Sequence, residues 1–326
     1  MKKLILLPLF ITIGMVMYAQ NTDDHSYHLE AKSLSEKTAT PIDTVTADTI
    51  RYWTYGGDIT INLSQVALKN WAAGGNSSIA ATGIVNFFTR YEKNRFVWDA
   101  KINLAYGIQK QGKLKVRKSD DVIDFTSQLG YKFNDYWKLG FLNNFRSQFT
   151  YGYEYDDAAD TRRLVSQFMA PAFVIAALGI EYQAPKFFKL FVSPVTSKSV
   201  IVLADAVPET KYGLDSNKTV FQNLGAYLVA NFDAEIFKNV TLSTRLELFS
   251  NYLKHPENID INWGTKVNMK VNNFLTVSLS TDLIYDDDIN VPKEREDGTI
   301  YQGKGTQFRE NLAIGIGYKF GQEKKK

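Results

Sequence analysis

The sequence predicts an all-β protein in which about twelve antiparallel strands close into a membrane-spanning, up-and-down barrel. Three observations predict this fold. The chain begins with a short hydrophobic leader, most of the rest alternates between apolar and polar residues, and short turns alternate with long polar loops. Strands that cross a membrane in this way need about nine to eleven residues each.

Residues 1–19 have the pattern of a secretory signal peptide. Lys2 and Lys3 precede an apolar run from Leu4 to Met17, and Ala19 is a small residue suited to cleavage. A membrane anchor is the alternative, but the run is short for a helix that must cross about 30 Å of hydrocarbon. We therefore expect export and removal of this segment.

Residues 20–50 differ in composition from the rest of the chain. They are rich in Thr, Ser, Asp and Ala and carry few large apolar side chains. Such a segment buries too little surface to offset the entropy lost on ordering. The sequence predicts a flexible periplasmic tail here, although residues 41–50 alternate enough to form a short strand against a partner.

From residue 51 onward the chain repeats with a period of two. In residues 96–109 every even position is apolar or aromatic, whereas the odd positions are mostly polar, small or charged. A helix would mix these two sets, but a strand separates them onto opposite faces. The same pattern recurs in residues 123–133, 137–151, 240–252, 259–271, 275–285 and 312–320.

Two folds bury one face of such strands, a soluble sandwich and a membrane barrel. The segments exceed the usual five or six residues of soluble strands, and aromatic residues such as Trp98 and Tyr106 lie toward their ends. Tight turns are expected at 93–94, 134–135, 185–186, 238–239 and 272–273, and longer loops around 111–121, 153–166, 204–218, 253–258 and 286–306. This asymmetry favours the barrel, with both chain ends on the periplasmic side.

Two strands are expected to be irregular. The segments 170–184 and 187–204 alternate less cleanly, and Pro171, Pro194 and Pro208 lie in or beside them. Proline removes a hydrogen bond of the sheet unless it lies at an edge, an end or a bulge. We expect irregular rims at these positions.

The stretch NWAAGGNSS separates the first expected strand, 58–63, from the second, 79–87. Its candidate residues are Asn70, Trp71, Gly74 and Gly75. A phosphate-binding loop would require a helix after the glycines, and a strand follows instead. The motif is therefore expected to be a turn on the long-loop side, with Trp71 at the membrane interface or in the barrel mouth.

Composition excludes several classes of site. The chain has no cysteine, which removes disulfides, thiolate metal sites and a lipoprotein anchor. Its 38 Lys and Arg against 35 Asp and Glu are spread along the chain, unlike the clustered basic charge of a nucleic-acid binder. We expect no cofactor, no metal and no nucleic-acid partner.

Few residues suggest catalysis or ion binding. His25 and His28 lie in the tail, where a metal site is disfavoured, and His255 lies near Ser250 but at a strand end that faces the other way. The acidic run 286–288 opens a long loop that could hold calcium, but the EF-hand spacing is absent. A solvated or lipopolysaccharide-facing loop is the favoured interpretation.

The polar positions of the strands are expected to line the lumen, and their charges are of both signs. A lumen of about twelve strands is intermediate between filled eight-stranded barrels and open sixteen-stranded porins. Both a weakly selective channel and a lumen closed by ion pairs therefore remain open. The expected lumen residues are Asp99, Lys101, Asp124, Lys132, Lys138, Arg146, Glu181, Arg245, Glu247, Asp260, Lys266, Lys270, Asp282 and Arg309.

Several longer stretches of the chain form a recognisable set: NWAAGG (70–75), WDAKINLAYG (98–107), FTYGYEY (149–155), SQFMAP (166–171), SPVTSK (193–198), FSNYLKHPENIDINW (249–263) and LIYDDD (283–288). In these stretches the chain resembles a family of secreted bacterial proteins known as domain of unknown function 3078. The resemblance implies an outer-membrane barrel. It implies no activity, substrate or site residues.

These patterns predict a non-enzymatic outer-membrane barrel that acts as a passive, porin-like channel for small solutes. One alternative is a non-conducting barrel whose outer loops bind a ligand or a partner, and another is an outer-membrane lipid hydrolase. Expected partners are outer-membrane lipid, lipopolysaccharide and the barrel-assembly machinery. The sequence leaves the oligomeric state and the solute open.

Overall fold

The computed structural model describes residues 52–68, 76–157, 159–184, 187–295 and 299–321. The chain divides into two units, Met1–Thr49 and Ile50–Lys326, and every described residue belongs to the second. The expected signal peptide, the tail and the loop residues Asn70, Trp71, Gly74 and Gly75 lie outside the described residues. Within the described ranges, no helix has the length and hydropathy needed to span a membrane.

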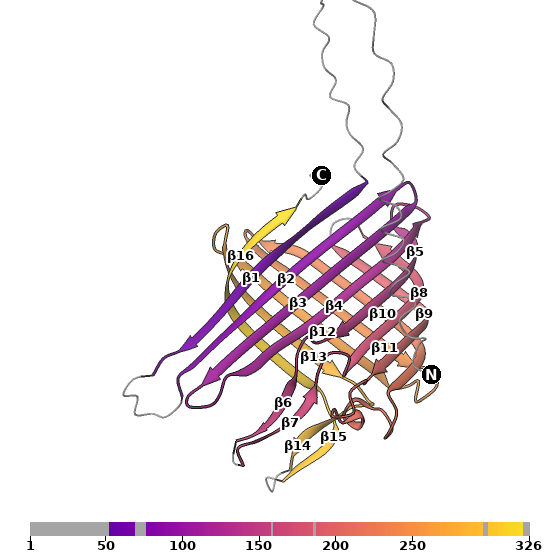
Figure 1. Cartoon of the computed structure of the whole chain (residues 1–326). Coiled ribbons are helices and arrows are strands. Elements are labelled where there is room, and N and C mark those ends of the chain that lie inside the picture. The colour runs from indigo at the N-terminus through magenta and orange to yellow at the C-terminus, as the bar shows by residue number, and fades with distance from the viewer. Residues whose placement is uncertain (1–51, 69–75, 158, 185–186, 296–298, 322–326) are drawn as a thin grey trace, which may run out of the picture. The chain divides into compact units, whose positions relative to one another are not determined.

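Twelve antiparallel strands form a closed barrel, which confirms the predicted fold (Figure 1). Around the barrel the strand order is β1-β16-β13-β12-β11-β10-β9-β8-β5-β4-β3-β2, and pairing of β1 with both β16 and β2 closes the sheet. The strands are β1 (Trp53–Val66), β2 (Ser78–Lys93), β3 (Phe96–Gln111), β4 (Arg117–Lys132), β5 (Trp137–Ser147), β8 (Ala172–Gln183), β9 (Phe188–Ile201), β10 (Val220–Phe237), β11 (Val240–Asn251), β12 (Ile259–Lys270), β13 (Leu275–Tyr285) and β16 (Gln307–Gly321).

The short connections lie at the end where β1 begins and β16 ends. Asn94 and Asn239 adopt left-handed backbone conformations, which asparagine tolerates in tight turns. The Asn134 side chain accepts hydrogen bonds from the amides of Tyr136 and Trp137, and Asn272 does the same for Phe274 and Leu275. Asparagine chemistry therefore sets these turns, as the sequence predicted.

The long loops emerge at the opposite end of the barrel. They contain two hairpins, β6 (Gly152–Asp156) with β7 (Thr161–Ser166) and β14 (Asn290–Glu294) with β15 (Ile300–Lys304), and a short 3-10 helix η1 (Glu209–Tyr212). Figure 1 shows both hairpins at the lower end of the barrel, away from the end of β16. Tyr212 donates a hydrogen bond to the carbonyl of Val165, which ties η1 to the first hairpin.

Several strand boundaries differ from those expected. β1 and β2 extend beyond the predicted segments 58–63 and 79–87. The predicted strand 137–151 ends at Ser147, because the chain leaves the barrel there to form β6 and β7. Phe149 and Tyr151 are therefore loop residues rather than members of the barrel wall.

The expected irregularity at Pro194 is present, but it lies inside β9 rather than at a rim. The register of β9 shifts relative to both β8 and β10 at this point. Ser193 compensates by donating to the carbonyl of Leu178 at 2.8 Å, and Thr196 donates to Ser193 at 2.7 Å. The bulge thus keeps polar groups paired where proline interrupts the sheet.

The outer and inner faces of the barrel differ as the alternation predicted. The outward side chains include Ile59 at 49% exposure on β1 and Ile314 at 55% on β16. Their register partners continue the apolar rows around the wall. The polar residues of the same strands face the lumen, which is where the candidate site lies.

Candidate functional site: the barrel lumen

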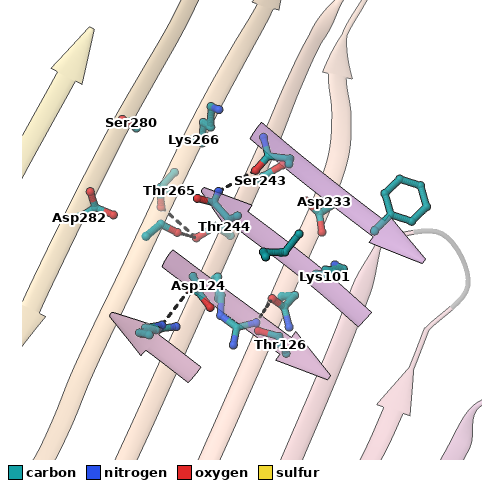
Figure 2. A pocket seen from close by; sticks show the side chains of 18 of the residues that line it. Lys101, Asp124, Thr126, Asp233, Ser243, Thr244, Thr265, Lys266, Ser280 and Asp282 are labelled. Carbon is teal, nitrogen blue, oxygen red and sulfur yellow. Dashed lines mark hydrogen bonds and ion pairs between the residues drawn. The ribbon is translucent and has the colours of Figure 1, made fainter. Parts of the chain in front are cut away.

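The strand register places all fourteen predicted lumen residues on one face of the sheet. A cavity of about 650 Å³ occupies the lumen, and seven of the fourteen line it. They are Lys101, Asp124, Arg146, Arg245, Lys266, Asp282 and Arg309. The other polar lining groups, which sequence reasoning did not single out, include Asn86, Asn103, Thr126, Asp233, Ser243 and Ser280. Figure 2 shows part of this lining.

Two ion pairs among the described residues join barrel strands that are separated by three others. Arg146 on β5 lies 2.8 Å from Glu247 on β11, although β8, β9 and β10 separate these strands. At about 4.8 Å per strand, the path along the wall is roughly 19 Å. Because Arg146 and Glu247 meet although their strands lie this far apart along the wall, the wall must curve closely around the lumen at this level.

The second crossing lies toward the long-loop end. Arg309 on β16 lies 3.3 Å from Asp120 on β4, and β1, β2 and β3 separate the two strands. Arg309 also pairs with its strand neighbour Asp282 at 2.8 Å. One arginine therefore holds carboxylates from two walls and narrows the lumen at this level.

Arg146 and Glu247 belong to a larger network. Arg146 pairs with Asp124 at 3.0 Å, and Arg245 pairs with Glu247 at 2.6 Å. Arg245 also donates to the side-chain oxygen of Asn231 at 3.0 Å. Each charge of this network thus has a partner, which is the condition for keeping ionic groups inside a protein.

Behind this network, one side of the lumen is filled by apolar side chains. These residues are buried and come from the inward faces of β5, β8, β9, β10 and β11: Leu142, Ile175, Ala177, Phe191, Tyr227, Val229 and Phe249. From the alternation, mostly polar, small or charged residues were expected on the inward face, and this cluster of large apolar side chains was not predicted. Apolar residues on both faces explain why 170–184 and 187–204 alternate poorly.

A second group of charges lies toward the end with the short turns. Lys138 pairs with Glu181 at 2.9 Å and with Asp99 at 3.6 Å, and Arg90 joins Asp99 at 3.1 Å. Glu92 bridges Arg90 and Lys132. The three cations and three carboxylates balance, so this group holds the strands together without adding net charge. Arg90 and Glu92 were not predicted to take part.

At the long-loop mouth, the acidic run 286–288 is paired with lysines. Lys198 contacts Asp260 at 2.7 Å and Asp286 at 3.3 Å, and Lys254 contacts Asp288 at 2.8 Å. Lys304 lies 3.7 Å from Asp287. Among the described residues, no group of three or more His, Cys, Asp or Glu side chains is arranged to hold a metal. Through these ion pairs, the acidic residues 286–288 hold the long loops in place.

The residues considered for lipid hydrolysis have other partners. Ser250 donates a hydrogen bond to the carbonyl of Pro256 at 2.6 Å. The His255 ring nitrogen Nδ1 lies 3.2 Å from Glu257. Ser250 and His255 are therefore not paired with each other. Of the remaining predicted residues, Lys270 faces the lumen at the exposed end of β12.

Comparisons with known proteins agree with this architecture. Residues 63–153 match the family model described as Protein of unknown function (DUF3078), which confirms the resemblance drawn from the sequence. No curated protein matches the chain.

Solved structures with a similar fold include three barrels. The translocator domain of the autotransporter NalP from Neisseria meningitidis is 9% identical, with a TM-score of 0.35 over 84% of this chain and 90% of that one. The NanC porin is 9% identical, with a TM-score of 0.33 over 80% and 97%. The TodX monoaromatic hydrocarbon channel is 8% identical, with a TM-score of 0.34 over 82% and 89%. At these values the likeness extends no further than the barrel fold.

Proposed function

We propose that the protein is a porin-like channel in the outer membrane that passes small polar solutes through its lumen. The observation that carries the proposal is the polar cavity of about 650 Å³ inside a closed twelve-stranded barrel. In a plugged barrel with a purely structural role, we would expect side chains to fill this space. Binding cavities for small molecules usually have volumes of about 300–1,000 Å³, so this space suits a small solute.

The outer surface supports the membrane location. Exposed apolar side chains occur along the outward faces of neighbouring strands, such as Leu63 on β1 and Leu312 on β16. A soluble protein would bury these rows, whereas lipid accommodates them. In this proposal the signal peptide directs export, the barrel-assembly machinery inserts the barrel, and lipopolysaccharide surrounds the long-loop end. No catalytic role is assigned.

The ion pairs that cross the lumen set the expected size limit. Arg146 with Glu247 and Arg309 with Asp120 place side chains across the space that a wide pore would leave open. Apolar side chains also occupy part of the lumen along the strands between Arg146 and Glu247. We therefore expect a narrow channel with small conductance rather than a general porin.

Single-channel recording in a planar lipid bilayer tests this function. The protein is refolded in detergent, and heat-modifiable migration on a gel verifies that the barrel is closed before recording. Stepwise currents that grow in proportion to salt concentration are the expected result. Folded protein that inserts but gives no steps would contradict the channel.

A second candidate is a non-conducting barrel whose outer loops bind a ligand or a partner. The observation in its favour is the same crossing of the lumen by Arg146 and Glu247, together with the apolar filling beside it. Absence of conductance from folded protein would favour this candidate. Binding would then be sought at the loops that carry β6, β7, β14 and β15.

A further inference from the structure

Most charged side chains that face the lumen form ion pairs, but a few of them do not. Among the cations that line the main cavity, Arg146, Arg245 and Arg309 each contact a carboxylate. Lys101 and Lys266 also line the cavity, but no carboxylate of the described residues lies within 4.0 Å of either. These two ammonium groups are free to bind a solute.

Lys266 is flanked by two hydroxyl groups. In the sheet register it lies opposite Ser243 on β11 and opposite Ser280 on β13, and all three residues line the cavity. Neighbouring strands lie about 4.8 Å apart, so the three side chains form a row across the wall. The Ser280 hydroxyl donates a long hydrogen bond of 3.5 Å to the carbonyl of Asn311. By rotating away from this weak partner it can join Lys266 and Ser243 in donating hydrogen bonds to an oxyanion.

Lys101 faces the same cavity from another wall. It belongs to β3, and β13, β16, β1 and β2 lie between β3 and the strand of Lys266. Figure 2 shows Lys101 on the violet strands and Lys266 on the orange strands beyond them. A solute in the cavity therefore meets a free ammonium group on each side.

A third free lysine lies in an adjoining space. Lys189 lines a smaller cavity of about 130 Å³ that shares Asn231 and Asp233 with the main one. No described carboxylate lies within 4.0 Å of Lys189. Asp233 is the opposing charge, because it lines both cavities and likewise has no cation within 4.0 Å. The three free ammonium groups exceed this carboxylate by two charges, and the group of Arg309 with Asp120 and Asp282 offsets one of them, so these groups together carry a single net positive charge.

We infer that the cavity selects small organic anions, and that a carboxylate group of the solute binds at Lys266, Ser243 and Ser280 opposite Lys101. This inference rests on the proposed channel and adds the chemical class of its solute. The balanced groups around Arg146 and Lys138 contribute no preference, so the selectivity comes from the free lysines.

The test is the reversal potential of single channels in a potassium chloride gradient, recorded for the wild-type protein, K101Q, K266Q, D233N and K115Q. The wild type is expected to have a chloride-to-potassium permeability ratio above one. K101Q and K266Q should each lower this ratio about sixfold, because Coulomb's law gives a factor of about 2.4 for one charge removed some 8 Å away in water, and this factor disfavours chloride and favours potassium. D233N should raise it. K115Q is the control, because Lys115 is 86% exposed in an outer loop.

Potassium citrate serves as the probe for binding. Added to the chamber, citrate should block the wild-type current at lower concentration than the K266Q current, whereas K115Q should behave like the wild type. A channel that conducts but prefers potassium, or whose ratio and citrate block are unchanged in K101Q and K266Q, would overturn this inference and leave the channel intact. Folded protein without conductance would remove the proposed function and this inference with it.

Discussion

Arg146 Nη2 and Glu247 Oε1 lie 2.8 Å apart, although their strands are separated by three others in the barrel. The contact joins residues 101 positions apart in the sequence. The intervening strands β8, β9 and β10 carry buried apolar side chains on their inward faces, whereas Arg146 itself lines the polar cavity. The lumen therefore has a side that is filled by apolar side chains and a side that is lined by the polar groups of the cavity.

The variant Glu247→Gln should destabilise the barrel. Glu247 is buried and contacts both Arg146 and Arg245, so its neutralisation leaves Asp124 as the one remaining carboxylate of this network for the two guanidinium groups. Because both arginines retain partial solvent contact, we expect a loss of about 2 kcal/mol rather than the full cost of a buried unpaired charge. Urea unfolding in lipid vesicles measures it.

A matched control for this variant is Glu154→Gln. Glu154 pairs with Arg163 at 2.7 Å, but both side chains are largely exposed on the outer hairpin. The loss there should be below about 0.5 kcal/mol. Equal stability of the two variants would contradict the structural role assigned to Glu247.

The variant Arg309→Ala should increase single-channel conductance. Arg309 on β16 ties Asp120 on β4 to Asp282 on β13, and its removal widens the lumen toward the long-loop end. The side chain is 65% exposed, so the barrel should still fold. Lys319→Ala removes an inward charge from the same strand without removing a crossing contact and should leave conductance close to wild type. A conductance that stays constant in R309A would show that the pair does not limit the pore.

The variant Gly179→Ala should disrupt the bulge at Pro194. A methyl group on Gly179 would overlap the carbonyl oxygen of Val192 and approach the Cα of Ser193 at 2.8 Å, and backbone cannot move aside cheaply. Overpacking of this kind costs about 1–3 kcal/mol. The measurement is again urea unfolding, with Gly83→Ala as the control, because its nearest neighbour would be the Tyr106 carbonyl oxygen at 4.0 Å. Equal effects would argue against the described path of β9.

The outer hairpin should respond to acid. The hydrogen bond from Arg163, followed by the charge of Lys211, holds the pKa of Glu154 below its ordinary value of 4.5. Because the folded pKa is lowered, the contact of β6 with β7 and η1 is stabilised above the unfolded pKa and is lost as pH falls through the folded one. Carbon NMR titration of Glu154 in micelles should show this low pKa, and Arg163→Gln should return it toward 4.5. An unchanged titration in that variant would contradict the pairing.

The sequence allowed the barrel wall to be predicted because its signals are local. Period-two alternation marks the lipid and lumen faces, and residues such as Asn134 and Asn272 mark the turns that join neighbouring strands. The count of strands followed from these signals and is confirmed. The exit of the chain from the barrel after Ser147 was missed, because Phe149 and Tyr151 continue the alternation into the loop.

The arrangement inside the lumen could not be predicted in the same way. Alternation places Arg146 and Glu247 on the inward face, but their contact depends on the curvature of the wall between them. The apolar side chains of Leu142 and Phe191 are inward although their strands also carry apolar residues outward. Which lysines remain free depends in turn on every other pairing, so Lys101 and Lys266 emerge only from the folded lumen.

The most direct test of the account is the single-channel conductance of the refolded wild-type protein in a planar bilayer. We expect small, salt-proportional current steps, because the lumen holds a polar cavity whose lining includes Arg146 and Arg309 of the crossing ion pairs. Folded, heat-modifiable protein that inserts and stays electrically silent would contradict it and would point to the outer loops as the working surface.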